Sequence, residues 1–169
     1  MQNTIFVHGL ESSGSGFKAR LLKKIFPNIY TPTFTKSTKS TPNMYDLLEI
    51  RMKELNLILA TKNNWILIGS SFGGLMSALY ALQNPSKVKQ LILLAPFLES
   101  RKLKPHMYNP IDIPVIIFHG IRDNVVQYKG SKKRAEIFFT NLNYNLVDDD
   151  HFLHHTVEQL DWKNLIIND

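Results

Sequence analysis

The chain has 169 residues, about the length of one domain, and 44% of them are hydrophobic, an ordinary share for a globular protein. It contains no cysteine, which excludes a disulfide framework and thiolate metal sites and suits a reducing cytoplasm. The formal net charge is +6, but the basic residues are scattered and lack the interleaved aromatic residues typical of a nucleic-acid surface. We therefore expect one domain over residues 1–169, in the cytoplasm, with no nucleic-acid partner and no membrane span.

The chain begins with a predicted strand over residues 4–8, followed by a Ser/Gly-rich loop from His8 to Gly16. A helical pattern then runs to Phe26 and ends at Pro27. The backbone amides of the loop could bind an anion, or the loop could be a simple connection. It is not a P-loop, because no G-K-[ST] sequence follows.

A second short strand is predicted over residues 28–34, and a long helix follows a polar loop. Pro42 is predicted to open this helix. One face of the helix carries apolar residues at helical spacing, namely Met44, Leu48, Met52, Leu55 and Leu59. We interpret the two methionines as core packing rather than as a binding surface.

The most informative stretch is a short apolar strand, Trp65 to Ile68, that leads into Gly69-Ser70-Ser71-Phe72-Gly73 and then into a helical pattern. A strand, a G-x-S-x-G sequence and a helix in this order form the context of a nucleophile elbow. The turn forces the middle serine, Ser71, into a strained conformation, and the flanking glycines let the chain fold back closely. A glycine-rich turn that binds a phosphate, or that only packs, is the alternative.

Three more strands are predicted, over residues 90–95, 113–119 and 143–147, with helices over 127–139 and from His151 to about Ile167. Six short apolar strands alternating with helices predict a mostly parallel sheet with helices on both faces. The segment from Pro96 to Asp112 is irregular and contains Pro105 and Pro110. Its apolar residues line an acyl pocket or cover the sheet edge: Phe97, Leu98, Leu103, Met107 and Tyr108.

Polar candidates follow four of the predicted strands: the loop after His8, Ser71, Asp123 and His151. In open parallel sheets, ligands bind outside the carboxyl ends of the strands. The order serine, acid, histidine along the chain is that of the α/β-hydrolases.

Several alternatives remain open for the acid and the base. His154 and His155 compete with His151, which could instead be a surface histidine, and Asp123 could only cap its loop. The acid could also come from the run Asp148-Asp149-Asp150. His8 and His119 fit a structural or pocket-lining role better than that of a base.

Together these motifs resemble the compact bacterial esterases of the YqiA type. The resemblance is carried by His8-Gly9-Leu10-Glu11-Ser12-Ser13, Gly69 to Gly74, Gly120 with Asp123 and Val126, and His151-Phe152. It implies an α/β-hydrolase fold that begins at the third strand of the usual sheet, with strand order second, first, third, fourth, fifth, sixth. It also implies Ser71, Asp123 and His151 as catalytic residues, with the backbone amides of Leu10 and Phe72 as the oxyanion hole. Many α/β-hydrolases carry a lid where this chain has only residues 96–112, so the resemblance implies little or no cap and a shallow, open site.

We thus expect a serine hydrolase that cleaves small acyl esters through an acyl-enzyme, without a cofactor or a metal. A zinc site is not expected, because the chain has no H-E-x-x-H motif. A thioesterase or acyl-peptide hydrolase would use the same residues. A hydrolase-fold protein that only binds a partner is the alternative from another class.

Overall fold

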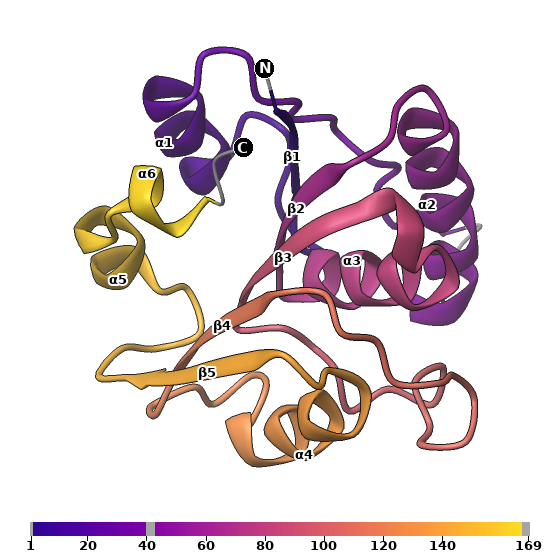
Figure 1. Cartoon of the computed structure of the whole chain (residues 1–169). Helices are drawn as coiled ribbons and strands as arrows, with labels where there is room; N and C mark the ends of the chain where they lie inside the picture. Colours follow the sequence, from indigo (N-terminus) through magenta and orange to yellow (C-terminus); the bar gives the residue numbers. More distant parts are fainter. Residues whose placement is uncertain (1, 40–42, 167–169) are drawn as a thin grey trace.

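The computed structural model describes residues 2–39 and 43–166 of the chain (Figure 1). Five strands form one sheet, and their bounds are β1 Asn3–Val7, β2 Trp65–Ser70, β3 Val88–Leu94, β4 Val115–Gly120 and β5 Leu142–Val147. Six α-helices connect them or follow them: α1 Phe17–Ile25, α2 Met44–Leu59, α3 Phe72–Gln83, α4 Tyr128–Phe138, α5 His154–Gln159 and α6 Trp162–Leu165. A short 3₁₀ turn, Pro85–Lys87, precedes β3.

The sheet is parallel throughout, and its strands lie in the order β1-β2-β3-β4-β5. All five carboxyl ends therefore meet at one edge, as the strand pattern predicts. The register brings Val7 beside Gly69, and Ser70 beside Leu94, so the ends of β1, β2 and β3 are level with one another. This alignment places the loops after these strands around one point.

Helices cover both faces of the sheet, as expected (Figure 1). Alternate residues of each strand face opposite sides. In β1, Ile5 and Val7 pack with α2, α3 and α4, whereas Phe6 packs on the other side with α1, α5 and α6. The middle strands β2 and β3 are buried on both faces, which explains their continuous apolar sequences.

The predicted second strand is reduced to a single bridge. Tyr30 pairs in parallel with Ile5, through hydrogen bonds from Phe6 N–H to Tyr30 O and from Tyr30 N–H to Thr4 O (2.8 and 2.9 Å). The segment therefore lies outside β1, where the expected strand order puts it. Its pairing is too short to form a strand because Pro27 and Pro32 flank it and cannot donate hydrogen bonds.

Helix α2 begins close to the predicted position. The side chain of Asn43 accepts hydrogen bonds from the backbone amides of Tyr45 and Asp46, which is the usual role of an N-cap asparagine. Pro42, which we expected to open the helix, lies outside the described residues. Met44 and Met52, the two methionines of the apolar face, both pack against the core. Met44 also lines the cavity beside Ser71.

The prediction of one continuous C-terminal helix is wrong. The chain forms two short helices, α5 and α6, separated by Leu160 and Asp161. Leu160 is extended, and the Asp161 side chain accepts a hydrogen bond from the Asn164 amide and thereby starts a new helix. The break turns the chain so that Trp162 is buried against the sheet. Ile167, the expected end, lies outside the described residues.

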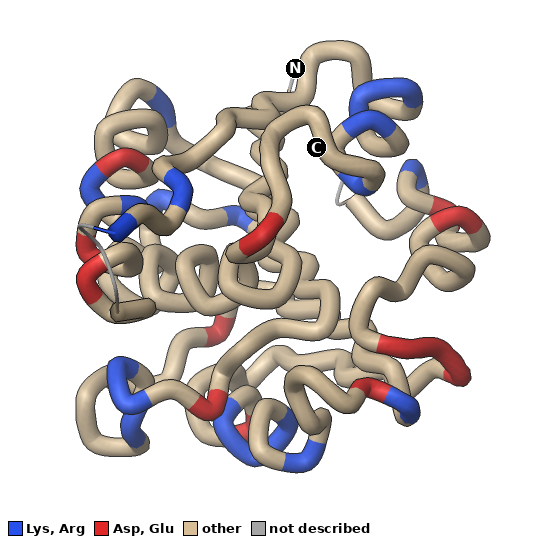
Figure 2. The backbone as a smooth tube through the Cα atoms, turned by 180° about the vertical axis from the view of Figure 1, so that it is seen from behind, with Lys and Arg blue, Asp and Glu red and all other residues tan. Residues whose placement is uncertain are grey.

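Residues 95–114 contain no helix and no strand, in agreement with a minimal cap. Within residues 2–39 and 43–166, every helix is too short or too polar to cross a membrane. Figure 2 shows Lys and Arg distributed over several helices and loops rather than gathered on one element.

The glycines on either side of Ser71 are required by close backbone packing, as the sequence predicts. A Cβ atom on Gly69 would lie 2.6 Å from the carbonyl oxygen of Gly73. A Cβ atom on Gly73 would overlap the carbonyl oxygens of Val7 and His8. Because these obstacles are backbone atoms, no side-chain movement can relieve them.

We therefore expect Gly73→Ala to lower the free energy of unfolding by about 3 kcal/mol or more, since the overlap forces β1 and α3 apart. Urea denaturation measures the change. Gly9→Ala is the matched control, because the nearest atom to its added Cβ would be 3.4 Å away. Equal stability of Gly73→Ala and Gly9→Ala would contradict the steric explanation.

Candidate active site

Ser71 lies in the sharp turn between β2 and α3, in a conformation that L-residues rarely adopt. Its φ and ψ angles are 53° and −115°. The turn is held on both sides, because the Ser71 amide donates to Leu94 O (2.9 Å) and the Ser71 carbonyl accepts from the Phe97 amide (3.1 Å). Strained backbone of this kind persists only where the surroundings enforce it, and it is concentrated at functional sites.

The structure brings Ser71, His151 and Asp123 together in one chain of hydrogen bonds. The Ser71 hydroxyl lies 3.0 Å from His151 Nε2, and His151 Nδ1 lies 2.7 Å from Asp123 Oδ2. The three residues follow β2, β5 and β4, so the sheet edge alone brings them into contact. The partners assign the tautomer: Nδ1–H donates to the carboxylate, and Nε2 accepts from the hydroxyl.

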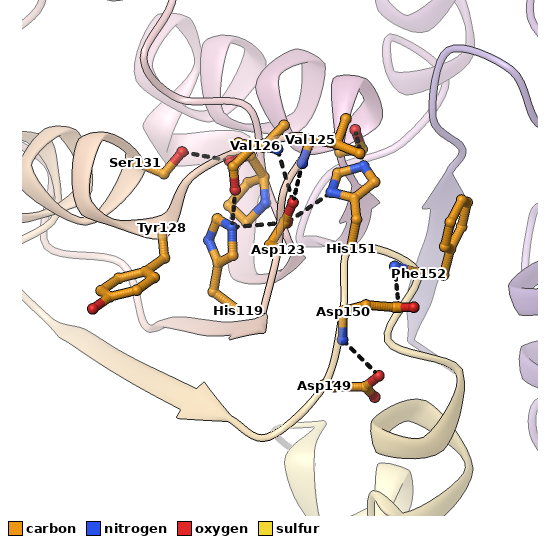
Figure 3. A network of polar contacts seen from close by, with 12 residues as sticks. His119, Asp123, Val125, Val126, Tyr128, Ser131, Asp149, Asp150, His151 and Phe152 are labelled. Carbon is orange, nitrogen blue, oxygen red and sulfur yellow. Dashed lines mark hydrogen bonds and ion pairs between the residues drawn. The ribbon is translucent and has the colours of Figure 1, made fainter. Parts of the chain in front are cut away.

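Asp123 is buried, and its carboxylate accepts four hydrogen bonds (Figure 3). Oδ1 accepts from the amides of Val125 and Val126 (2.9 and 2.8 Å). Oδ2 accepts from His151 and also from Nε2–H of His119 (3.1 Å), which lies on the other side of the carboxylate. The acid is therefore fixed in position by the strand β4 and by the turn after it.

His119 is fully buried and serves this carboxylate rather than a substrate. Its Nε2–H is shared with Val126 O (2.8 Å), and its Nδ1 lies 2.7 Å from the Tyr144 hydroxyl. Burial lowers the pKa of His119, although Val126 O and Asp123 oppose the change. Burial likewise raises the pKa of Tyr144, so the pair is neutral near pH 7. This agrees with the expectation that His119 is structural.

The loop after β1 is held by hydrogen bonds from two buried side chains, His8 and Arg51. His8 accepts a hydrogen bond from the Phe34 amide at Nε2 (2.9 Å) and donates from Nδ1 to Gly9 O (2.7 Å). Arg51 donates to Gly9 O (3.3 Å), Leu10 O (3.0 Å) and Thr35 O (2.7 Å). Burial lowers the pKa of His8, which keeps it neutral, whereas arginine keeps its proton at any pH of interest.

These contacts orient the amide of Leu10. In a trans peptide, the N–H and the C=O point in opposite directions. Because His8 and Arg51 bind the carbonyl of Gly9, the N–H of Leu10 points away from them. Leu10 and Phe72 both line the cavity beside Ser71, and Phe72 N–H is at the N-terminus of α3, where the helix leaves amides unpaired.

A cavity of about 600 Å³ opens beside Ser71 and His151. This volume is in the range of small-molecule sites. The walls are mostly apolar, formed by Phe6, Leu10, Phe17, Met44, Phe72, Phe97, Val125, Val126 and Phe152. Polar or charged residues of the lining are Glu11, Ser12, Lys18, Ser70, Ser71, His151 and His154.

Of the five residues proposed for an acyl pocket, the structure assigns only Phe97 to this cavity. Leu98 and Leu103 are buried in the core, and the Tyr108 ring packs on Phe138. Other lining residues come from α1, α2 and the segment after β5. A sequence pattern could not reveal this, because these segments are far apart along the chain.

The alternative acids and bases have other roles. Asp148 pairs with Arg122 (2.9 Å), Asp149 accepts from the amide and hydroxyl of Thr156, and Asp150 accepts from the Phe152 amide. His154 begins helix α5 and stacks on Phe17, with 4.4 Å between ring centroids.

His151 and His155 are four residues apart, a spacing that can bind a metal on a helix, but α5 begins only at His154. Among the described residues, no three or more His, Asp or Glu side chains converge as metal ligands would.

Several backbone amides of the Ser/Gly-rich loop have partners within the protein. Four of its amides are already used within the protein: Ser12 N–H by Gly9 O, Gly14 N–H by Thr33 Oγ1, Ser15 N–H by Ser13 Oγ, and Gly16 N–H by Ser13 O. The loop is therefore a folded connection that carries Leu10 to the site.

Sequence reasoning missed two residues near the site, Arg51 and Lys18. Arg51 carried a signal, because it lies at i+4 spacing between Leu47 and Leu55 on the buried side of α2. A lone arginine on such a stripe predicts a buried cation with specific acceptors. Lys18 carried no signal, since a lysine in the first turn of a helix is ordinary.

Residues 31–107 match a family model described as the alpha/beta hydrolase fold. The mouse alpha/beta hydrolase domain-containing protein 10 superposes with a TM-score of 0.78 at 17% identity, over 92% of this chain and 85% of that one. Est1E from Butyrivibrio proteoclasticus, with bound ferulic acid, superposes with a TM-score of 0.72 at 16% identity, over 94% and 84%. The chain has the α/β-hydrolase fold.

Two curated relatives add sequence similarity. A segment of 67 residues is 46% identical to a probable 1-acylglycerol-3-phosphate O-acyltransferase of rice, Oryza sativa subsp. japonica. That match covers 38% of this chain and only 15% of the rice protein. The acyl-protein thioesterase 1 of Cryptococcus neoformans is 24% identical over 178 residues, which cover 85% of this chain and 75% of the fungal protein.

The role assigned to Arg51 can be tested through stability. Arg51→Met keeps much of the side-chain volume but leaves three carbonyl oxygens without this donor, so we expect the free energy of unfolding to fall by about 3 kcal/mol. Lys53→Met, an exposed change on the same helix that removes the same charge, should alter it by less than about 0.5 kcal/mol. Denaturant titration measures both. If Arg51→Met is as stable as Lys53→Met, Arg51 does not hold the loop.

Proposed function

We propose that this protein is a serine hydrolase that cleaves acyl esters through a covalent acyl-enzyme. Ser71 is the nucleophile, His151 is the general base and then the general acid, and Asp123 orients His151 and stabilises its charged form. The backbone amides of Leu10 and Phe72 form the oxyanion hole. The observation that carries the proposal is the unbroken chain of hydrogen bonds from Ser71 through His151 to Asp123, with Ser71 in a strained turn at the mouth of a cavity.

The chemistry follows from this arrangement. His151 Nε2 takes the proton of the Ser71 hydroxyl while Oγ forms a bond to the acyl carbon. The bond from that carbon to the leaving oxygen then breaks, and His151 gives its proton to the leaving group. Water repeats the sequence on the acyl-enzyme and releases the acid. In each half, negative charge develops on the former carbonyl oxygen, where two amides in fixed positions stabilise it by roughly 3 kcal/mol each.

A thioesterase is the second candidate, and one observation favours it. The fungal relative that covers 85% of this chain is an acyl-protein thioesterase, and a thioester would use the same nucleophile, base and oxyanion hole. The narrower resemblance to YqiA-type esterases favours an oxygen ester instead. Turnover of S-phenyl thiobutyrate and of phenyl butyrate decides between them. Faster turnover of the thioester would favour a thioesterase, and faster turnover of the oxygen ester would favour an esterase.

The first test is turnover of p-nitrophenyl acetate and butyrate by wild type and by Ser71→Ala. We expect Ser71→Ala to lower kcat by roughly three orders of magnitude or more, because no other hydroxyl replaces the nucleophile. Ser70→Ala is the matched control: it removes the neighbouring hydroxyl, which does not contact His151, and should retain most of the activity.

Labelling with a fluorophosphonate gives an independent result. An active enzyme reacts once per chain at Ser71, and Ser71→Ala does not react. Equal turnover by wild type and Ser71→Ala, or no labelling of the wild type, would remove the proposal. It would favour a hydrolase-fold protein that only binds a partner.

His119 and Tyr144, the buried pair that contacts Asp123 through His119, can be tested by mutation. His119→Phe removes one donor to Asp123 Oδ2 and should lower kcat by about tenfold with little change in KM, because the carboxylate then holds His151 less firmly. Tyr144→Phe should cause a smaller loss of the same kind. Tyr128→Phe is the control, since its ring also lies beside His119 but its hydroxyl is not in this network. A loss confined to KM would contradict a positioning role.

A further inference from the structure

One residue of the lining of the cavity beside Ser71, Lys18, carries a charge that cleavage of a simple ester does not require. Lys18 is the second residue of α1, and its side chain lines the same cavity as Ser71 and His151. Most of the other lining residues are apolar, among them Phe6, Phe17 and Phe152. An acyl chain alone would gain nothing from a cation at this position.

Lys18 also differs from Arg51 in its partners. It makes no hydrogen bond or ion pair with any described residue, whereas Arg51, the other partly desolvated cation near the site, donates to three carbonyl oxygens. The charges that act on Lys18 are Asp149 and Asp150, and both have hydrogen bonds elsewhere, to Thr156 and Phe152. Glu11, His151 and His154 are the other ionisable groups of the lining.

Burial lowers the pKa of Lys18 to about 8, and the two aspartates only partly oppose this. The amine therefore still carries its proton at neutral pH, but it is poorly solvated. A ligand carboxylate would restore to it the charge-assisted hydrogen bond that the protein does not provide. Since the cavity is far larger than an acetyl group needs, a substrate can reach both Ser71 and Lys18.

We propose that the natural substrate is an acyl ester that carries a carboxylate on its acyl part, and that Lys18 binds this carboxylate. The proposal rests on the proposed function for the reaction, but it concerns a separate contact. One ammonium matches one singly charged carboxylate, and the apolar walls accept the methylene groups between the carboxylate and the ester. Lys18 and the apolar walls together would thus select acyl esters with a carboxylate on the acyl part.

A pair of esters tests the proposal directly: mono(4-nitrophenyl) adipate, which has a free carboxylate, and its methyl-capped diester, which is neutral. For wild type we expect kcat/KM to be about tenfold higher for the acid than for the capped ester. Lys18→Met should abolish the preference. Lys23→Met removes the same charge from an exposed position on the same helix and should leave the preference intact.

The pH dependence adds a specific signature. The carboxylate stays ionised above neutral pH, so the preference of the wild type should decline as pH rises through about 8, where Lys18 loses its proton. Lys18→Arg should keep the preference and lose this decline, because arginine stays charged. A preference that survives in Lys18→Met, or that is absent from the wild type, would overturn the proposal.

A binding measurement tests the carboxylate site independently of the proposed reaction. Monomethyl adipate and dimethyl adipate can be titrated by calorimetry into Ser71→Ala and into the double variant Ser71→Ala/Lys18→Met. We expect the anion to bind about tenfold more tightly than the neutral diester, and only when Lys18 is present. Because this measurement needs no turnover, a protein that hydrolyses no ester can still support or overturn the carboxylate site. Equal binding of both compounds would overturn it.

Discussion

The contact between the turn at Ser71 and the end of β1 is the constraint on which the site depends. Gly73 lies so close to the carbonyls of Val7 and His8 that no side chain fits between them. This contact ties α3 to β1 and leaves Ser71 no conformation other than the strained one, with φ at 53°. The hydrogen bonds of Ser71 to Leu94 and Phe97 join the same turn to β3 and to the loop after it. Four segments are thus fixed relative to one hydroxyl.

Buried polar groups also fix the residues around Ser71. His8 and Arg51 orient the loop that carries Leu10. His119, which contacts the Tyr144 hydroxyl, donates a hydrogen bond to Asp123. Among the described residues, no buried side-chain nitrogen or oxygen lacks a hydrogen-bond partner. Networks of this kind are costly when incomplete and rigid when complete, so they fix donors and acceptors before a substrate arrives. The half-buried amine of Lys18 stands apart from this network, which is why it points to a ligand.

The α/β-hydrolase fold by itself does not select a substrate. In this chain the segment that elsewhere could form a cap, residues 95–114, contains no helix and contributes only Phe97 to the cavity. The other lining residues come from β1 and the loop after it, the turn between β2 and α3, and the turn after β4, together with the starts of α1 and α2 and the segment between β5 and α5. The cavity lining is therefore spread over several short segments around one edge of the sheet.

The sequence by itself determined the parallel sheet, the strained serine turn and the order of the candidate residues, because these follow from local periodicity and from the steric needs of glycine. It also predicted that Ser71, Asp123 and His151 lie at strand ends, where a parallel sheet brings them to one edge. Only the tertiary structure decided which acid contacts His151, that the second strand shrinks to a bridge at Tyr30, and that the C-terminal helix breaks before Asp161. It alone revealed the cavity, the carbonyl groups that Arg51 contacts and the place of Lys18 in the cavity lining. These features depend on contacts between segments distant along the chain, which local patterns do not encode.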